Sequence, residues 1–312
     1  MEEKHLISVV IPTHNRCDLI SRAVNSARNQ TYKNIEIIVV SDGSEDATDD
    51  VMEKIMKEDS RVRYHSYHPN RGGNVARNTG IKMAVGDYVA FLDDDDEWHS
   101  DKLEKQMKII QENPEIGLVC TGTNSVTEGQ KTVTVFIPPA KYDSSEFSLV
   151  RNCIGSTTTV MVKRELLLKV GLFDEQLGAL QDYDLWVRLC RITKVGVVRE
   201  ACVEYNNSQS SNQISSYTDK YEKAVAYLDE KYKDWISELS KEDRDKRNIW
   251  FLLLLSKKAK RNGNPKLARQ YAVKAGKVKP TKAVIACYGS TFFSGEFVNK
   301  VVALTRKVSA KR

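Results

Sequence analysis

Apolar runs alternate with amphipathic stretches through the first hundred residues of the chain. Apolar runs with the length and composition of strands lie at 7–12, 35–40 and 88–92, and the mixed segment at 61–67 also resembles a strand. Between them, apolar residues three and four positions apart predict helices, the first of which Asp18 can cap. The run at 7–12 is continuous and rich in β-branched residues, which is typical of a strand buried on both faces. This alternation predicts a parallel sheet with helices on both sides.

The pattern changes after residue 100. Helices are expected at 103–111, 165–170 and 180–192, and strands at 116–121, 131–137, 157–162 and 195–205. A stretch rich in Asn and Ser at 206–216 then resembles a linker. The rest is helical in pattern, at 217–235, 242–261, 266–276 and 283–307. We therefore expect an α/β domain over residues 1–210 and an all-helical region over residues 217–312.

Composition narrows the class of protein. Of the 312 residues, 41% are apolar and 29% charged, as in globular proteins. The six cysteines are scattered without a Cys-x-x-Cys pair, which disfavours a zinc site or a disulfide framework and suits a reducing cytosol. No signal-peptide pattern precedes the first strand, and the apolar run at 249–255 is far shorter than the ~20 residues that span a bilayer. We expect a cytoplasmic protein without a membrane span.

Five carboxylates, from Asp93 to Glu97, directly follow the predicted strand at 88–92. Like charges this close favour retained protons, and a divalent cation removes that cost. Hard oxygen ligands suit Mg²⁺ or Mn²⁺. The cluster also lies at the carboxyl end of a strand, where open α/β sheets bind ligands. The alternative is a solvated acidic loop.

Polar residues also follow the other predicted strands. Thr13 and Asn15 come after the first strand, and Asp42 follows the second, where a carboxylate can accept hydrogen bonds from a base or ribose. Arg77, after the Gly72-Gly73 turn, can pair with a phosphate or a base edge. The chain contains neither a P-loop motif nor a Gly-x-Gly-x-x-Gly after the first strand, which disfavours a P-loop enzyme and a dinucleotide oxidoreductase.

Six motifs occur in a characteristic order. They are Ser8-Val-Val-Ile-Pro-Thr-His-Asn-Arg16, Ser41-Asp-Gly-Ser44, Gly73-x-x-Ala-Arg-Asn-x-Gly80, Phe91-Leu-Asp-Asp-Asp-Asp-Glu-Trp98, Gly171-Leu-Phe-Asp174 and Gln181-Asp-Tyr-Asp-Leu-Trp-Val-Arg188. Together they resemble the family 2 inverting glycosyltransferases of the GT-A fold, over about the first 205 residues. The resemblance implies a Rossmann-like, mostly parallel sheet flanked by helices. It also implies transfer of a sugar from a nucleotide-diphospho-sugar, with a UDP-sugar as the default donor.

The same resemblance assigns roles by position. It implies that the nucleotide is held by Pro12, Thr13, Asn15, Asp42, Arg77, Asp93 and Asp94. Asp95 is the expected ligand of Mg²⁺ or Mn²⁺, with Asp93 beside it. No histidine occurs after His99, so a late histidine ligand, which some GT-A enzymes use, cannot be supplied. Diphosphate oxygens and water would complete the coordination.

Asp182 matches the catalytic base of the family's Glu-Asp motif. A base is needed because a sugar hydroxyl is a poor nucleophile, and attack opposite the leaving group inverts the anomeric centre. Asp182 starts a predicted helix, whose N-terminal dipole favours the ionised carboxylate. The first motif position is Gln181 rather than Glu, and Asp184 competes for the role of base. The alternative for Asp182 is a helix cap.

Two tryptophans near these motifs are expected to differ in role. Trp186 follows Asp182 by one helical turn, together with Leu185 and Leu189, which favours core packing. Trp98 follows the acid cluster and is the better candidate for a wall beside the donor or acceptor.

Charge is unevenly distributed. Residues 257–312 hold fifteen Lys or Arg and one acid, a net charge of +14, which leaves −8 for residues 1–256. A basic helical region can bind an anionic membrane, where each basic residue contributes ~1 kcal/mol. A peripheral position at the inner face of the cell membrane and a lipid-linked acceptor would follow; the alternative is a solvated lysine-rich bundle. Nucleic acid is not an expected partner, because aromatic residues do not interleave with the charges.

The predicted function is sugar transfer to a glycan or a lipid-linked acceptor in cell-surface polysaccharide or glycoprotein synthesis. Two alternatives belong to other classes. A non-catalytic nucleotide-sugar-binding scaffold would be expected to lack the acid cluster or Asp182. A nucleotidyltransferase would usually carry a Gly-rich, basic loop after the first strand, and Thr13-His-Asn-Arg16 is not such a loop.

Overall fold

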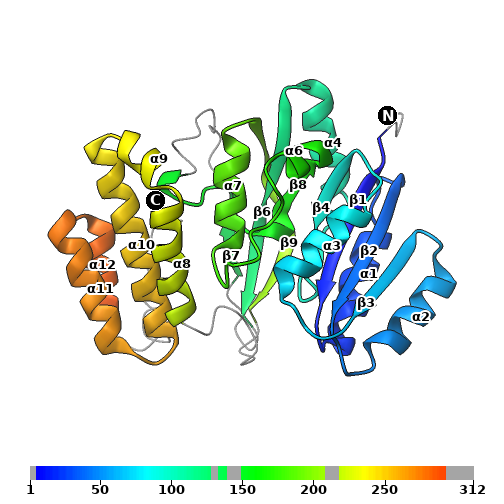
Figure 1. Cartoon of the computed structure of the whole chain (residues 1–312), viewed down its shortest axis with the longest axis horizontal. Helices are drawn as coiled ribbons and strands as arrows, with labels where there is room; N and C mark the ends of the chain where they lie inside the picture. The colour runs from blue at the N-terminus through cyan, green and yellow to red at the C-terminus, as the bar shows by residue number, and fades with distance from the viewer. Residues whose placement is uncertain (1–4, 128–132, 139–148, 208–217, 293–312) are drawn as a thin grey trace, which may run out of the picture. The chain divides into compact units, whose positions relative to one another are not determined.

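The computed structural model describes residues 5–127, 133–138, 149–207 and 218–292 (Figure 1). The chain divides into two compact units. The first comprises residues 1–148, 152–177 and 181–209, and the second comprises 149–151, 178–180 and 210–312. The first unit contains the sheet and the second is helical. The assignment of a separate function to each region stays a prediction.

One mixed sheet forms the centre of the first unit. Its strands, in spatial order, are β3 (Val62–Tyr67), β2 (Ile35–Asp42), β1 (Ile7–Thr13), β4 (Tyr88–Phe91), β8 (Val160–Lys163), β6 (Ile116–Thr127), β9 (Lys194–Asn207) and β5 (Glu97–Trp98), with β7 (Val133–Phe136) paired to β6. The four strands from β3 to β4 are parallel, as the sequence predicts. Strand β8 then runs antiparallel to both β4 and β6, and β6 is parallel to β9. Parallel strands therefore place the loops after β1, β2 and β4 at one edge of the sheet.

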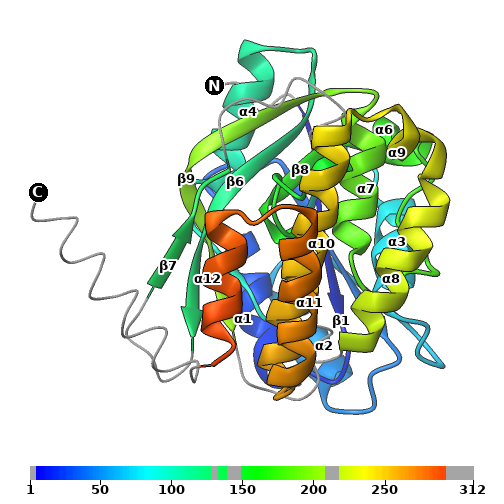
Figure 2. The same cartoon turned by 90° about the vertical axis from the view of Figure 1, so that its left-hand side faces the viewer.

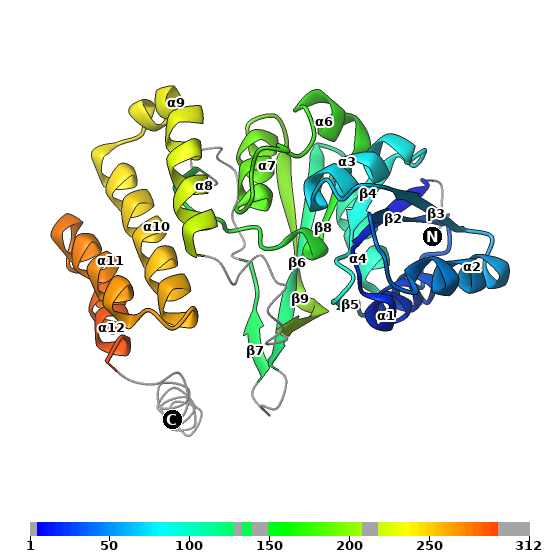
Figure 3. The same cartoon turned by 60° about the horizontal axis from the view of Figure 1, so that its bottom comes forward.

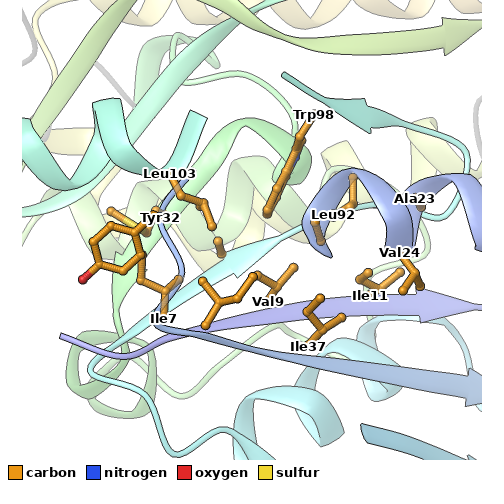
Figure 4. Close-up of a cluster of buried hydrophobic side chains, with 14 of the residues drawn as sticks. Ile7, Val9, Ile11, Ala23, Val24, Tyr32, Ile37, Leu92, Trp98 and Leu103 are labelled. Carbon is orange, nitrogen blue, oxygen red and sulfur yellow. The ribbon is translucent and has the colours of Figure 1, made fainter. Parts of the chain in front are cut away.

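Helices cover both faces of this sheet (Figures 1 and 3). One face packs against α1 (Cys17–Arg28), α2 (Thr48–Glu58) and α4 (Lys102–Glu112). The other packs against α3 (Gly73–Met83), α6 (Arg164–Lys169) and α7 (Gln181–Cys190). Strand β1 contributes to both cores: Val9 and Ile11 point into the cluster shown in Figure 4, whereas Val10 belongs to the opposite one. The continuous apolar run at 7–12 is thus buried on both sides.

Two glycines of the predicted motifs are required by close approaches. A Cβ atom on Gly80 of α3 would lie 2.4 Å from Cγ1 of Val10, so this helix packs directly on β1. Gly43 has a φ of +70°, and a Cβ there would lie 2.7 Å from the backbone nitrogen of Asn70. The absence of a side chain at residue 43 therefore allows the loops after β2 and β3 to contact each other.

Three local expectations are wrong. Asp18 does not cap α1: the helix begins at Cys17, whose N–H donates to the Asp46 carboxylate over 2.9 Å. The predicted strand at 157–162 begins only at Val160, because residues 157–159 form a 3₁₀ turn, η1 (Thr157–Thr159).

The third concerns Trp98, which is buried in the core of Figure 4 rather than lining a sugar site. Its indole nitrogen donates to the carbonyl of Thr158 over 2.9 Å. This bond helps to hold η1 in place, and a neighbouring one adds to it: the Gln106 amide donates to the carbonyl of Thr159 over 3.0 Å.

The second unit consists of α8 (Thr218–Lys231), α9 (Lys233–Glu238), α10 (Lys241–Arg261), α11 (Pro265–Val278) and α12 (Lys282–Ser290). Side chains cap three of these helices: Ser240, Asn264 and Thr281 accept backbone N–H groups from Asp243, Leu267 and Val284. Figure 2 shows α12 beside α11, and a small apolar cluster of Ile249, Ala275 and Val284 joins them to α10. None of the described helices is long and apolar enough to cross a membrane.

The helical predictions hold in part. The segment predicted at 217–235 is interrupted at Tyr232, where α8 gives way to α9. The helix predicted at 283–307 ends at Ser290, and its part beyond residue 292 lies outside the described residues. Most of the predicted linker at 206–216 also lies outside them, apart from its first two residues, which end β9.

Lys102, at the start of α4, gives a testable consequence of this packing. The side chain is fully buried, its Nζ donates to Oε1 of Gln106 over 3.0 Å and lies 3.8 Å from the ring centroid of Trp98, and burial lowers its pKa to about 7. The unfolded chain keeps this proton to a much higher pH, so the native state gains stability as the pH rises above 7. We expect the free energy of unfolding to rise by about 2 kcal/mol more in the wild type than in Lys102→Met between pH 7 and 9.

Urea denaturation of both proteins at the two pH values measures this difference. Lys108→Met removes an exposed lysine of the same helix and serves as the control, with no expected change in pH dependence. Parallel stability curves for the wild type and Lys102→Met would show that the buried amine keeps an ordinary pKa.

Candidate active site

The site is built at the edge of the sheet where β1, β2 and β4 end. Thr13 ends β1 and is buried, and its hydroxyl donates to Oδ2 of Asp94 over 2.8 Å. Pro12 precedes it within the strand and lies opposite Val40 of β2, so it contributes a buried wall rather than a polar group. The hydrogen bond from Thr13 joins the end of the first strand to the acid cluster.

Arg16 is a central residue of the acid cluster that the sequence reasoning did not assign. Its Nη1 lies 2.5 Å from Oδ1 of Asp94 and 3.0 Å from Oδ2 of Asp95. Arg22 of α1 adds a hydrogen bond of 2.8 Å to the backbone carbonyl of Asp95. The only sequence signal was the position of Arg16 within the first motif. The two guanidinium groups hold the loop of carboxylates in one conformation.

Burial and charge raise the pKa values of these carboxyls. Burial raises the pKa of Asp94 to about 6 and the Asp95 charge adds to the shift, while Arg16 and the Thr13 hydroxyl oppose it. Burial also raises the pKa of Asp95, and the charge of Asp93 adds to this. The cluster therefore concentrates negative charge where water is partly excluded.

Asp93 joins β4 to α3 and to η1. Its Oδ1 accepts from Nη2 of Arg77 over 2.6 Å, and its Oδ2 accepts from the hydroxyl of Thr157 over 3.1 Å. Arg77 is almost buried, with its guanidinium 5.7 Å from the ring centroid of Phe173. Its Nε has no hydrogen-bond partner within the described parts of the chain. Thr157 was also missed from the sequence, because the 3₁₀ turn that carries it reads as a strand.

Asp42 and Asn15, both expected to contact the nucleotide, connect loops in the structure. The buried carboxylate of Asp42 accepts three hydrogen bonds of 2.8 Å, from the Tyr67 hydroxyl and the N–H groups of Arg71 and Gly72. Oδ1 of Asn15 accepts from the N–H of Glu45 over 2.7 Å. These bonds fix the loops after β1, β2 and β3 relative to one another. A direct role for Asp42 and Asn15 in nucleotide binding stays a prediction.

Asp182 lies in the first turn of α7 and is partly exposed. Its Oδ1 accepts from the N–H of Tyr183 over 2.7 Å, and its Oδ2 accepts from Nδ2 of Asn152 over 3.2 Å. Burial raises the pKa of Asp182, and the hydrogen bond from the Tyr183 N–H opposes that rise. The positive charge of Arg77 lowers the same pKa, whereas the negative charge of Asp93 raises it. The structure thus brings Asp182 within electrostatic reach of the Arg77–Asp93 pair.

Asn152 orients Asp182 through a compact turn. Its Oδ1 accepts from the N–H groups of Ile154 and Gly155 over 3.1 and 3.0 Å, while its amide donates to Asp182. The indole of Trp186, one turn along α7, donates to the carbonyl of Gly155 over 3.0 Å. No signal in the sequence pointed to Asn152. Trp186 is buried in the core, as expected.

Asp184, the competing candidate for the base, is engaged elsewhere. It is fully buried, and its Oδ2 accepts from Nη2 of Arg188 over 2.6 Å and from Nε over 3.1 Å. Arg188 in turn donates to the carbonyl of Val170 over 2.6 Å. A carboxylate held in this way is poorly placed to take a proton from a substrate, so the geometry favours Asp182.

Asp93 and Asp95 offer carboxylate oxygens, the type of ligand that Mg²⁺ and Mn²⁺ prefer. The side chains of Asp93 and Asp95 are about one fifth exposed (23% and 19%), and the charge of Asp93 helps to raise the pKa of Asp95. The described residues contain no cluster of three or more His, Cys, Asp or Glu side chains arranged around one point. A cation held here would therefore take protein ligands mainly from Asp93 and Asp95, in competition with Arg16, and the remaining ligands from a diphosphate and water.

Comparisons with known proteins show which family the chain resembles. The family model described as glycosyl transferase family 2 matches residues 8–170. The chain is 34% identical over 218 residues to the putative teichuronic acid biosynthesis glycosyltransferase TuaG of Bacillus subtilis, covering 67% of this chain and 83% of the relative. It is 32% identical over 226 residues to an uncharacterised glycosyltransferase of Rickettsia typhi, covering 70% and 69%. The amylovoran biosynthesis glycosyltransferase AmsB of Erwinia amylovora is 34% identical over 194 residues, covering 58% and 62%.

Solved structures share the fold at low sequence identity. TarS of S. aureus in complex with UDP-GlcNAc superposes with a TM-score of 0.59 and 18% identity, covering 91% of this chain and 90% of that one. The mannosyltransferase PcManGT of Pyrobaculum calidifontis, in complex with GDP-Man and Mn²⁺, gives a TM-score of 0.59 and 16% identity, covering 93% and 88%. The sheet flanked by helices is therefore the GT-A fold. From its sequence, fold and relatives together, the chain belongs to glycosyl transferase family 2 and is a glycosyltransferase.

Proposed function

We propose that the protein transfers a sugar, with inversion, from a nucleoside-diphospho-sugar to a hydroxyl of a glycan or lipid-linked acceptor in cell-surface polysaccharide synthesis. The observation that carries the proposal is the electrostatic interaction of Asp182 with both Arg77 and Asp93, which are themselves joined by a hydrogen bond of 2.6 Å. TuaG and AmsB, described as glycosyltransferases of teichuronic acid and amylovoran biosynthesis, support the acceptor class. The donors bound by TarS and PcManGT support the donor class.

Each side chain of the site has its own role in the proposed reaction. Asp182 takes the proton of the acceptor hydroxyl as that oxygen attacks the anomeric carbon, and Asn152 holds the carboxylate in position. Arg77 stabilises negative charge on the departing diphosphate, and Asp93 fixes its orientation. A divalent cation, when bound, supplies further stabilisation of that leaving group. Its protein ligands would be Asp93 and Asp95, in a loop that Arg16 and Thr13 hold in place through Asp94.

The carboxylate of Asp182 suits the role of general base. Burial raises its pKa above that of an ordinary aspartate, which makes the carboxylate a stronger base. The positive charge of Arg77 favours the ionised carboxylate and opposes this rise.

A donor screen tests the proposal. We expect one class among UDP-, GDP- and dTDP-sugars, with UDP-sugars first, to raise the melting temperature in the presence of Mn²⁺ by roughly 5 °C at saturating concentration. The same donor should be hydrolysed slowly in Mn²⁺ and not in EDTA. Binding without hydrolysis or transfer to any acceptor would instead identify a non-catalytic scaffold. Failure of every nucleotide sugar to bind would contradict the proposed function.

A further inference from the structure

Helix α12 and the turn that follows it carry three large, exposed apolar side chains. Ile285, Tyr288 and Phe292 are 63%, 41% and 54% exposed, and they follow one another at helical spacing. Val284 and Cys287 of the same helix are buried. The rings of Tyr288 and Phe292 are in edge-to-face contact, with centroids 5.2 Å apart. We call Ile285, Tyr288 and Phe292 the α12 face.

The segment that carries this face is basic and contains no acidic residue. Residues 257–292 contain ten Lys or Arg and no Asp or Glu. The guanidinium carbon of Arg269, on α11, lies 4.6 Å from the ring centroid of Phe292, and Lys282 starts α12 itself. Lys277 and Lys279, at the end of α11 and in the turn to α12, are exposed. The sequence continues this bias, with five basic residues and one acid in the last twenty positions.

We propose that the α12 face is a membrane-docking surface that inserts Ile285, Tyr288 and Phe292 into the interface of an anionic bilayer while the surrounding lysines and arginines contact its headgroups. The combination fits the interface of a bilayer, where aromatic and aliphatic side chains bury beside acyl chains and cations meet anionic lipid. An acidic groove on another protein would also complement the positive charges of this segment. It would not, however, require the exposed apolar side chains of the α12 face. The inference concerns where the enzyme works and does not depend on which sugar it transfers.

Vesicle co-sedimentation of the full-length protein tests this surface. In 50 mM salt we expect partitioning onto phosphatidylcholine vesicles with 30% phosphatidylglycerol to exceed that onto pure phosphatidylcholine by at least ~10-fold, because most of the attraction is electrostatic. It should fall strongly at 500 mM salt. The triple variant Ile285→Ser, Tyr288→Ser, Phe292→Ser should lose ~10-fold or more of the binding to anionic vesicles, because it removes the inserted side chains.

A matched control is available in the first unit. Val85, Leu168 and Ile192 are 70%, 45% and 39% exposed there, so replacing all three by serine removes similar apolar surface from another place. This variant should partition like the wild type. Lys277→Gln, Lys279→Gln, Lys282→Gln should weaken binding to anionic vesicles and leave the small binding to neutral ones unchanged. Circular dichroism and thermal melting establish that each variant is folded.

Several outcomes would overturn the proposal. One is a wild type that does not sediment with anionic vesicles, and another is a folded α12-face variant that sediments as well as the wild type. A control variant that loses as much binding would show that the effect is not local. Binding of a DNA duplex in place of vesicles would identify a nucleic-acid surface instead. The vesicle assay contains no nucleotide sugar, so its result is independent of the donor screen.

Discussion

Replacing Asp182 by Asn should lower the rate of sugar transfer by about 10²- to 10⁴-fold, the usual contribution of a general base. The asparagine keeps the shape of the side chain and can still meet the N–H of Tyr183, but it cannot accept the proton of an acceptor hydroxyl. Affinity for the nucleotide sugar should change little, because the donor is expected to contact the Arg77 side of the site. Initial rates and donor titrations by thermal shift measure the two quantities separately.

The pH profile gives this prediction a second readout. Because burial raises the pKa of Asp182, protonation of the carboxyl should reduce the turnover of the wild type as the pH falls through that raised value. Above it the base is ionised and turnover should level off. The residual rate of Asp182→Asn should lack this acidic limb. A wild-type profile that stays flat over the acidic range would argue against a carboxylate base.

Asp184→Asn is the matched comparison, two residues away on the same helix. It weakens the buried pair with Arg188, so it should lower the melting temperature. The folded variant should nevertheless retain turnover within a few-fold of the wild type. If Asp184→Asn abolished transfer in folded protein while Asp182→Asn remained active, the base would have to be reassigned.

Replacing Asp95 by Ala should lower turnover by about 10³-fold, since a metal ion contributes several kcal/mol to stabilisation of the leaving group. It should also remove the increase in melting temperature that Mn²⁺ gives in the presence of a nucleoside diphosphate. The proposed metal site contains few protein carboxylates. Without Asp95, the cation would therefore be held mainly by the diphosphate. A manganese titration of the melting temperature, with and without UDP or GDP, measures this directly.

Glu97→Gln provides the control for that experiment. Glu97 ends the same acidic run, but its side chain is about half exposed and lies 3.8 Å from Nε of Arg22. Its replacement should leave the manganese dependence unchanged. Equal losses in Asp95→Ala and Glu97→Gln would point to the total charge of the loop rather than to a specific ligand.

The strands and helices of the first hundred residues could be predicted because each is encoded locally. The continuous apolar run at 7–12 specifies a strand buried on both faces, and the spacing of apolar residues specifies the helices between strands. The turn at 157–159 could not be predicted in this way. Its three threonines favour a strand locally, whereas hydrogen bonds from Trp98 and Gln106, distant in sequence, accompany a 3₁₀ conformation.

The candidate site shows the same division. Asp93, Asp94, Asp95 and Asp182 belong to recognisable motifs, and the structure places the three acids of the cluster together. Arg16 and Asn152 were missed because their importance lies in which carboxylate they meet, at separations of 78 and 30 residues. Trp98 was misassigned because proximity to a motif does not reveal on which side of the sheet a side chain is buried.

The attachment of Asp182 to α7 has a consequence for how such an enzyme can change its acceptor. Leu185, Trp186 and Leu189 of this helix are packed in the core. The packing of α7 therefore sets the position of the Asp182 carboxylate. Residues around the acceptor can then be exchanged without relocating the proposed base. Directed evolution towards a new acceptor should accordingly succeed through the neighbouring loops and fail through substitutions on the buried side of α7.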